Sequence, residues 1–566
     1  MNHSKNNPSK NFDQMRVLVI DRHNNARSTL RTILSTLGIV AIHNALTTAE
    51  VMRQVKTYLF DAIFADFQFE DGRDAQQLLE ELRQKHLVSL STVYMIVTAE
   101  RTYRNVVSVA ELAPDDYLIK PFTADQLQAR LDKALYKKVF FEEVFDHLDR
   151  SALADAVSAC DRLLERGANP FLHDTLRFKG DALNTLGRYD EADAIFQRVL
   201  DQADLPWAKM GLAVAFRGLR NMAEAERLAS SLIKNHSEFL AAYDFLAHLF
   251  EEQGRLEEAQ DILQRAASIS GNNSLRQRAI GDLAVRNKDF ETAERAYGKV
   301  LERHRGSSLR SIDDYTNLIR VMLDSDHVER AQKITQDLRR DWRGNSQGEL
   351  AALAMECLCA NKEDESGRIK QQTLDKALSL FDTVNRDSSS TQFSQRVAVD
   401  LAHACLMLGN DFKAEEILSR VVAENHEDSG MIDRIQGVFT RTGKEEEGKT
   451  LLAKVGREIV ELNNRGVMAA RNGDIESAVQ MLIEAAESAP NLQFLVNASK
   501  AIFTLLARKG WDEQMAIRGK HYLEMAQAKD IRSPKVISAR ELYLQVARKY
   551  GIEVAQKGPI HGKTKR

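Results

Sequence analysis

The segment Arg16-Val-Leu-Val-Ile-Asp21 decides how the first part of this 566-residue chain is expected to fold, because a short apolar run ends there on a carboxylate. Similar apolar runs end on Asp66, on Thr98 and on Lys120-Pro121. Short apolar runs that alternate with amphipathic segments are typical of buried parallel strands joined by crossover helices. Ligands of such sheets bind at the carboxyl ends of the strands. We therefore expect two acids, a hydroxyl and a lysine to meet in one pocket suited to accepting a phosphoryl group.

The spacing of these residues resembles the receiver domain of bacterial two-component response regulators, from about Met15 to Ala134. Phe60-Asp-Ala-Ile-Phe-Ala-Asp66 resembles the strand that carries the phosphoacceptor, and Asp71-Gly72 resembles the turn after it. Val97-Thr98-Ala99 resembles the switch strand, and Asp116-Tyr-Leu-Ile-Lys-Pro-Phe122 resembles the last strand. The resemblance implies an α/β fold with a flavodoxin-like, doubly wound sheet of five parallel strands.

The resemblance also implies a role for each residue of the pocket. Asp66 would be the phosphoacceptor, Lys120 would pair with a phosphoryl oxygen, and the hydroxyl of Thr98 would donate to the phosphoryl group. Tyr117 would be the aromatic side chain that swings inward when the hydroxyl moves. Pro121 would follow a cis peptide bond, which a tight turn tolerates.

One position departs from the family, which usually has two adjacent acids after the first strand to help hold magnesium. The pair here is Asp21-Arg22. Mg²⁺ prefers oxygen ligands and often uses only one or two carboxylates, so Asp21, Asp66 and the backbone carbonyl of Gln68 would hold it weakly. Alternatively, the Arg22 guanidinium takes the place of the metal and pairs with Asp66, or Arg22 points to solvent and nothing replaces the missing ligand. Magnesium is therefore expected to bind weakly or not at all.

Beyond about residue 136 the strand-like runs stop, and a repeat with a period near 34 residues begins. Corresponding alanines lie 33, 34 and 34 residues apart, at Ala192, Ala225, Ala259 and Ala293. The segments Gly187-Arg-Tyr-Asp-Glu-Ala-Asp-Ala-Ile-Phe196 and Gly254-Arg-Leu-Glu-Glu-Ala-Gln-Asp-Ile-Leu263 illustrate the similarity between units. The pattern resembles the tetratricopeptide (TPR) repeat, a helix pair in which small residues allow close approach and large ones fill the gap to the next repeat. We therefore expect an all-α solenoid after the α/β domain.

These patterns predict the organisation of the chain. We expect a disordered N-terminus at 1–14, a receiver domain at 15–136, a TPR solenoid at 137–496 with a long insertion at about 362–395, a C-terminal helical cap at 497–555, and a disordered basic tail at 556–566.

Composition weighs against several classes of function. The formal net charge is −4, from 78 basic and 82 acidic residues, so no excess of positive charge favours nucleic acid. The N-terminus lacks an apolar signal core, and no apolar stretch is long enough to span a bilayer. The four cysteines are expected to be buried small hydrophobes, without a redox or zinc spacing: Cys160, Cys357, Cys359 and Cys405. A reducing cytoplasm fits this usage.

The leading hypothesis is a response regulator, not an enzyme, that receives a phosphoryl group from a histidine kinase or phosphotransfer protein and binds a protein or peptide in its solenoid groove. The following side chains are candidates for lining that groove: Arg177, Asp181, Arg217, His248, Asn317 and Arg320. Two alternatives stay open. In one, a degenerate receiver docks a kinase and competes for phosphotransfer to another regulator. In the other, the solenoid or the tail binds nucleic acid. A homodimer is also left open.

Overall fold

The computed structural model describes residues 12–99, 114–166, 169–271, 273–307, 309–360, 367–386, 394–425, 428–530 and 533–552. The chain divides into two compact units, the first ending at Gln253 and the second covering Gly254–Val554. Each unit is described separately below. Among the described residues, no helix combines the length and apolar character that crossing a bilayer requires.

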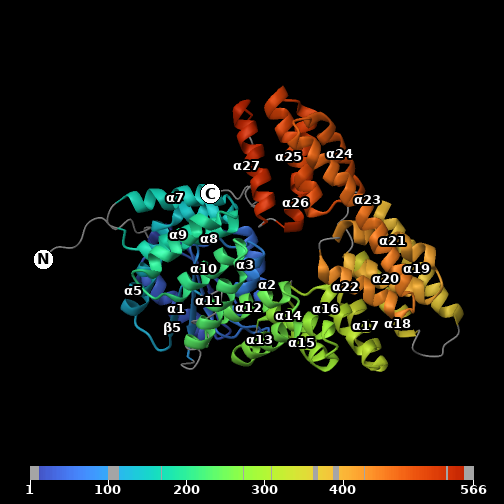
Figure 1. The fold of residues 1–566 in the computed structure, drawn as a ribbon. Helices are drawn as coiled ribbons and strands as arrows, with labels where there is room; N and C mark the ends of the chain where they lie inside the picture. The colour runs from blue at the N-terminus through green and yellow to red at the C-terminus, as the bar shows by residue number, and fades with distance from the viewer. Residues whose placement is uncertain are drawn as a thin grey trace. The chain divides into compact units, whose positions relative to one another are not determined.

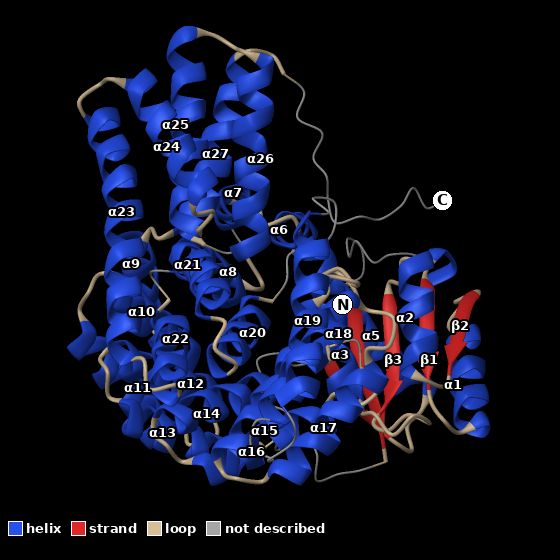
Figure 2. Cartoon of the chain, turned by 90° about the vertical axis from the view of Figure 1, so that its right-hand side faces the viewer, coloured by secondary structure: helices blue, strands red, loops and turns tan. Residues whose placement is uncertain are grey.

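The first unit begins with a five-stranded parallel sheet in the order β2-β1-β3-β4-β5, as predicted (Figure 2). Its strands are β1 (Arg16–Ile20), β2 (Ala41–Ala45), β3 (Ala62–Asp66), β4 (Val93–Thr98) and β5 (Asp116–Ile119). The helices described with it are α1 (Asn24–Thr36), α2 (Thr48–Thr57), α3 (Ala75–Gln84) and α5 (Ala124–Phe140).

Side chains of each strand alternate between the two faces of the sheet. On one face, Val17 and Val19 pack in a cluster that includes side chains of α1 and α5. On the other face, Leu18 and Ile20 pack with side chains of α2 and α3. The sheet is therefore covered on both sides, which explains why its strands read as continuous apolar runs.

The N-terminal expectation needs a correction. Residues 12–14 were expected to be disordered, but Phe12–Gln14 form a short 3-10 helix, η1. Phe12 packs against the apolar cluster that contains Met15, which explains its order. Residues 1–11, the tail at 556–566, and residues 361–366 and 387–393 of the expected insertion lie outside the described residues. Within that insertion, α19 (Gly367–Arg386) is a 20-residue helix.

The rest of the described chain is helical, from α6 to α27 (Figure 1). The first unit contains α6 (Glu142–Asp149), α7 (Leu153–Glu165), α8 (Leu172–Leu186), α9 (Tyr189–Leu200), α10 (Pro206–Gly218), α11 (Met222–Asn235) and α12 (Leu240–Glu252). The second unit contains α13 (Leu256–Ile269), α14 (Ser274–Arg286), α15 (Phe290–Arg303), α16 (Ile312–Asp324), α17 (Val328–Asp341), α18 (Ser346–Ala360), α19, α20 (Gln395–Met407), α21 (Asp411–Asn425), α22 (Ser429–Arg441), α23 (Glu445–Arg471), α24 (Ile475–Ser488), α25 (Leu492–Lys509), α26 (Glu513–Asp530) and α27 (Pro534–Lys549).

Close approach within the helix pairs depends on glycine and alanine, as the repeat pattern predicted. A Cβ atom on Gly180 would lie 2.4 Å from Cζ of Phe196, and one on Gly281 would lie 2.6 Å from Cε1 of Tyr297. Both aromatic rings are almost fully buried. Each ring therefore occupies the space that a side chain on the facing glycine would need.

All four cysteines are buried, as expected. Burial raises the pKa of Cys160, Cys357 and Cys405 to about 12. A thiol with such a pKa stays protonated at neutral pH, so these side chains act as small apolar groups.

Two expected domain boundaries fall inside helices. The boundary at 136 lies within α5, which continues to Phe140, and the boundary at 496 lies within α25. Only Phe141 separates α5 from α6, so the receiver's last helix leads directly into the solenoid. α25 packs against both α26 and α27, and the ring of Phe503 in α25 contacts the ring of Tyr543 in α27.

Candidate functional site

Three charged side chains meet at the carboxyl edge of the sheet. Lys120 follows β5, and its Nζ lies 2.8 Å from Oδ2 of Asp21 and 3.0 Å from Oδ1 of Asp66. Asp21 follows β1, and Asp66 ends β3. The structure therefore brings together the two acids and the lysine, because parallel strands end at one edge of the sheet.

The ammonium group of Lys120 is held as a cation. Burial opposes its charge, but the hydrogen bond with Asp21 and the charge of Asp66 outweigh that effect, and the pKa of Lys120 lies above its usual value. One lysine between two carboxylates leaves a formal charge of −1 in the pocket. The lysine can therefore stabilise added negative charge while it stays fixed by both acids.

The turn after β1 is fixed by contacts of Asp21. Its Oδ1 accepts a hydrogen bond of 2.8 Å from the backbone N–H of His23. Its carbonyl oxygen accepts from Nη1 of Arg27 at 2.6 Å. Arg27 was not among the residues predicted for the site. In the sequence, only its position four residues after His23, one turn into α1, indicates that Arg27 could contact this turn. Such a signal is weak.

Arg22 points away from the acids. Its Nε donates to Nε2 of His23 at 3.1 Å, and both side chains are exposed. Of the three arrangements considered from the sequence, this geometry corresponds to an outward arginine, and Arg22 does not pair with Asp66.

The remaining predicted residues lie in β4, in β5 and in the segments that follow β3 and β5. Thr98 ends β4, is buried, and accepts a hydrogen bond of 2.8 Å at its carbonyl from the backbone N–H of Lys120. The Lys120–Pro121 bond is cis. Tyr117 lies in β5 and packs partly buried against the cluster on the α2 and α3 face, and burial raises the pKa of its phenol. Gln68 is exposed, and a backbone bridge to Asp74 holds the loop that carries it.

A buried polar network supports the loop after Asp66. Asp71 accepts hydrogen bonds from the backbone and the hydroxyl of Thr48, at 2.8 and 2.5 Å. Arg73 donates to the same hydroxyl at 2.9 Å and pairs with Glu81 at 2.5 Å. The sequence predicted a turn at Asp71-Gly72, but not this network, because its partners lie on α2 and α3.

The donor set fits magnesium only in part. Among the described residues, no group of three or more His, Cys, Asp or Glu side chains is arranged to hold a metal ion. Asp21 and Asp66 supply two carboxylates, but one oxygen of each bonds Lys120, and His23 binds the other oxygen of Asp21. Asp66, Asp21 and the Gln68 carbonyl are the groups that would hold Mg²⁺, whose usual needs are one or two carboxylates plus water.

A cavity of about 220 Å³ adjoins these carboxylates. Ile20, Leu30, Ile33, Phe64, Val97 and Phe122 form most of its apolar lining. Asp21, Asp66 and Lys120 form its polar part. The cavity therefore places an apolar recess beside the two carboxylates and the lysine.

The joint between the receiver and the solenoid is made of specific contacts. Oδ2 of Asp149, the last residue of α6, accepts from Oγ of Ser89 at 2.6 Å and from the backbone N–H of Leu90 at 3.0 Å. Nζ of Lys138 donates to the carbonyl of Leu90 at 2.7 Å and pairs with Asp115 at 2.7 Å. Leu90 also packs against an aromatic cluster centred on Phe141. The segment before β4 is thus bonded to α6, the first helix after the receiver, and the last turn of α5 is bonded to the segments before β4 and β5.

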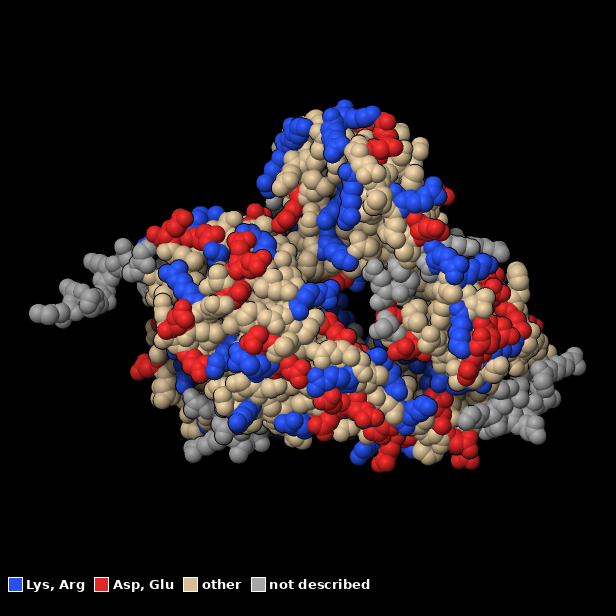
Figure 3. All heavy atoms as spheres, in the orientation of Figure 1, with Lys and Arg blue, Asp and Glu red and all other residues tan. Residues whose placement is uncertain are grey.

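The candidate groove residues of the first unit are exposed and paired with one another. Arg177 lies 3.7 Å from Asp181 within α8. Arg217 pairs with Glu252, and its guanidinium also lies 3.0 Å from Nε2 of His248. On the face drawn in Figure 3, basic and acidic side chains are interspersed over most helices. No large surface of one sign appears there.

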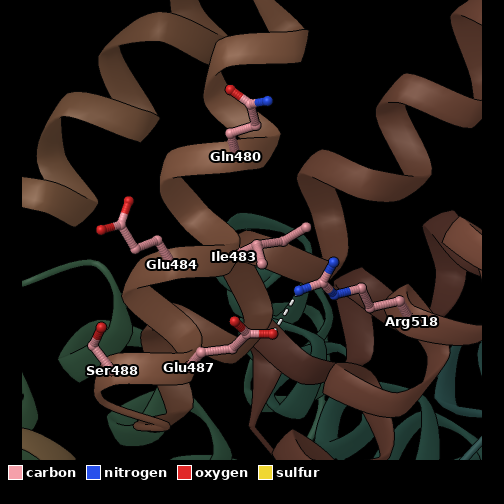
Figure 4. Close-up of a pocket in the computed structure, with 6 residues that line it drawn as sticks. All are labelled: Gln480, Ile483, Glu484, Glu487, Ser488 and Arg518. Carbon is pink, nitrogen blue, oxygen red and sulfur yellow. Dashed lines mark hydrogen bonds and ion pairs between the residues drawn. The ribbon is translucent and has the colours of Figure 1, made fainter.

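A surface pocket of about 380 Å³ lies between α24 and α26 (Figure 4). It is lined by Gln480, Ile483, Glu484, Glu487, Ser488 and Arg518. Arg518 bonds Glu487 at 2.6 Å, and the hydroxyl of Tyr522 donates to the same carboxylate at 2.8 Å. These bonds lower the pKa of Glu487 and satisfy its charge. We therefore interpret the pocket as a shallow groove between α24 and α26.

Comparison with known families agrees with this architecture. The family described as "Response regulator receiver domain" matches residues 17–132. Families described as "Tetratricopeptide repeat" match residues 178–203 and 210–274. The chain joins a response regulator receiver domain to tetratricopeptide repeats.

Curated relatives match the receiver domain. A probable transcriptional regulator, ycf27, from Cyanidium caldarium is 29% identical over 126 residues, which is 22% of this chain and 48% of the relative. The chemotaxis protein CheY-3 of Vibrio cholerae is 28% identical over 119 residues, which is 21% of this chain and 90% of the relative. The match to the first therefore spans about half of that protein.

Solved structures resemble the repeats. MamA (residues 41 to the end) from Desulfovibrio magneticus RS-1 is 20% identical, with a TM-score of 0.26, over 30% of this chain and 96% of that one. A tetratricopeptide repeat protein from Parabacteroides merdae is 12% identical, with a TM-score of 0.31, over 53% of this chain and 98% of that one.

Proposed function

We propose that this protein is a response regulator whose Asp66 accepts a phosphoryl group and whose solenoid binds a partner protein. The bridge from Lys120 to Asp21 and Asp66 is the observation that supports the input step most directly. Lys120 engages Oδ1 of Asp66. The other oxygen, Oδ2, is left to attack phosphorus.

The reaction is a transfer between two covalent carriers. An oxygen of Asp66 forms a bond to phosphorus as the bond from phosphorus to the nitrogen of a phosphohistidine breaks, and the histidine takes up a proton. Catalysis of such a transfer depends on positioning and on neutralising charge on the phosphoryl oxygens. Lys120 supplies one positive charge at the acceptor, and the hydroxyl of Thr98 would donate to a phosphoryl oxygen. Magnesium, held weakly by Asp21, Asp66 and the Gln68 carbonyl, would supply further neutralisation when bound.

The output would be protein binding. A solenoid presents an extended surface in which each repeat contacts its neighbours, and in this chain Asp149 bonds the receiver directly to α6, the first helix after it. Two-component signalling would therefore reach the repeats without a flexible linker. The partners would be a histidine kinase or phosphotransfer protein on the receiver and a protein or peptide on the repeats.

The second candidate function is competition. Arg22 occupies the position of a metal-binding acid and points outward. A receiver that binds metal poorly could dock a kinase and limit phosphotransfer to another regulator without an output partner of its own.

Phosphotransfer separates these candidates. Full-length protein and an Asp66→Asn variant are each mixed with the phosphorylated cognate kinase and magnesium, and label on the regulator is followed over time. Label on the wild type and none on the variant supports the response regulator. Transfer of label from the kinase to a second receiver is measured in the same way. If the wild type and the Asp66→Asn variant slow that transfer equally and neither becomes labelled, the result supports the competitor. The output is tested by affinity purification with full-length protein, with and without beryllofluoride, followed by mass spectrometry.

A further inference from the structure

Polar side chains of α16, α20 and α22 in the second unit form one cluster. On α16, Asn317, Arg320 and Asp324 share one face at helical spacing. Arg441 of α22 lies 3.2 Å from Asp324, and Nη2 of Arg434, also on α22, donates to Oδ1 of Asn317 at 3.1 Å. The partners in each pair are 117 residues apart in the sequence. Asn317 and Asp324 therefore bond side chains of another helix of the same unit, which corrects the expectation that Asn317 and Arg320 face an open groove.

Two guanidinium groups converge on a single neutral oxygen. Arg320 donates to Oδ1 of Asn317 at 2.8 Å, and Arg434 donates to the same atom at 3.1 Å. Arg320 also pairs with Asp400 of α20 at 2.8 Å. For Arg434, the described part of the chain offers no carboxylate within ion-pair distance, and its Nη1 is buried without a hydrogen-bond partner. Burial and the charges of Arg320 and Arg396 lower the pKa of Arg434 to about 9 against the opposing charges of Asp400 and Asp282, so the group still carries its charge at neutral pH.

His403 lies one turn after Asp400 on α20 and faces the same cluster. Only 8% of its surface is exposed, and neither ring nitrogen has a hydrogen-bond partner among the described residues. Burial and the charges of Arg441 and Arg320 lower its pKa to about 3, so the imidazole is neutral. Buried polar groups are nearly always partnered, and an unpaired buried charge is costly. An unpaired arginine and an unpartnered imidazole in one cluster indicate a missing anionic partner.

We propose that Arg434 and Arg320, with the imidazole of His403, form a binding site for a small oxyanion, a phosphate or a carboxylate. The guanidinium fork matches both groups geometrically, and hydrogen bonds between charged partners are the stronger ones. Oδ1 of Asp400 is already paired with Arg320, and its Oδ2, which is buried without a hydrogen-bond partner among the described residues, would repel an anion, so the ligand would bind on the side of Arg434. Because the ligand would bond side chains of α16, α20 and α22, it would hold the three helices together. This site is independent of Asp66 and of the proposed phosphotransfer.

The test compares the thermal unfolding of full-length protein in inorganic phosphate, in acetate and in sodium chloride at matched ionic strength. A ligand that binds only the folded state raises the Tm in a saturable way. We expect phosphate, acetate or both to raise the Tm of the wild type above the chloride reference. A rise with phosphate alone identifies a phosphate site, and a rise with acetate identifies a carboxylate site. If neither raises the Tm, the proposal is wrong.

The matched variants are Arg434→Met and Arg457→Met. Arg457 is exposed on α23 and lies outside the cluster, so its variant should bind like the wild type. Arg434→Met should weaken oxyanion binding by more than about tenfold, as expected for a lost charge-assisted hydrogen bond. It should fold, because the change removes an unpaired charge. An oxyanion effect that persists in Arg434→Met would contradict the proposal.

A spectroscopic readout locates the ligand. In full-length protein, the imidazole carbon protons of His403, assigned with a His403→Gln variant, should shift on addition of the oxyanion that raises the Tm. The same resonances should not move in Arg434→Met. Unmoved His403 resonances in the wild type would place the binding elsewhere and overturn the proposal.

Discussion

At the scale of single residues, the replacement of Arg22 has the clearest expected effect on magnesium binding. It stands where a second carboxylate would face the metal, and its side chain is turned to His23. Arg22→Asp adds an oxygen ligand beside Asp21, so magnesium affinity should rise about tenfold or more. Calorimetric titration of full-length protein measures the change. Arg31→Asp, on the exposed face of α1, alters the net charge equally and serves as control. Equal affinity of Arg22→Asp and wild type would rule out the ligand-replacement argument.

The free energy of unfolding should depend strongly on the ion pair between Arg73 and Glu81. Both side chains are buried, with 7% and 1% of their surfaces exposed. Glu81→Gln leaves the guanidinium of Arg73 without its counter-charge, and removing one partner of a buried pair costs about 3–5 kcal/mol. Urea unfolding followed by circular dichroism should report the loss, whereas Glu70→Gln, at an exposed position in the same loop, should change little. A loss below about 1 kcal/mol would mean that water reaches Arg73.

How far the site was predictable from sequence depends on where each partner lies. Asp21, Asp66 and Lys120 could be placed together because every parallel strand delivers its last residue to the same edge. Arg27 and Arg73 could not, because their partners depend on how α1, α2 and α3 lie over the sheet. The pairing of Arg434 with Asn317, 117 residues away, depends on the curvature of the repeats, which no local pattern encodes.

At the scale of elements, the joint between α5 and α6 carries a buried lysine with two bonds. Lys138→Met removes the cation that Asp115 and the Leu90 carbonyl share. Because these two acceptors then lack a donor, the free energy of unfolding should fall by about 1–3 kcal/mol. Limited proteolysis should then cut near residue 140 earlier than in the wild type. Lys133→Met, one turn earlier and exposed on α5, is the control. Identical cleavage of both variants would argue that the joint does not depend on Lys138.

The helix pairs offer a matched test of close packing. Gly281→Ala places a Cβ 2.6 Å from the ring of Tyr297, and overpacking of this kind costs about 1–3 kcal/mol. Gly298→Ala, in the facing helix α15, meets no atom within 4 Å and should be neutral or stabilising by up to about 1 kcal/mol. The Tm of Gly281→Ala should therefore fall below that of the wild type, and the Tm of Gly298→Ala should stay the same or rise. A destabilised Gly298→Ala would show that helix propensity does not govern this position.

The same elements show where the repeat pattern stops being informative. Regular spacing predicted the pairs from Ala192 to Ala293, and glycine facing an aromatic ring is their physical basis. The 27-residue helix α23 was not predicted. No proline interrupts the sequence between Gly448 and Gly466, so the second helix of one pair continues into the first helix of the next. Turn signals mark repeat boundaries only where the chain breaks its helix.

At the scale of the whole molecule, the question is whether the receiver controls the repeats. Coupling requires an element with two arrangements that both sites bias. Tyr117 is the candidate, because it lies in β5, partly buried, on the strand that leads to Lys120. Asp115 stands just before that strand and pairs with Lys138. A change in β5 therefore has a bonded route to the last turn of α5, which leads into α6.

We predict that Tyr117→Ala and Asp66→Ala each change the affinity of full-length protein for its partner, once affinity purification has identified it. The expected coupling is about 1–3 kcal/mol, the usual range for linked sites. Beryllofluoride should shift the affinity of the wild type and leave that of Asp66→Ala unchanged, because the analogue needs the Asp66 carboxylate. Lys138→Met should reduce the beryllofluoride effect if the bond to Asp115 transmits it, while Lys133→Met should not. If beryllofluoride and both receiver variants leave partner affinity unchanged, the receiver does not control the repeats, and competition for the kinase becomes the better account of this protein.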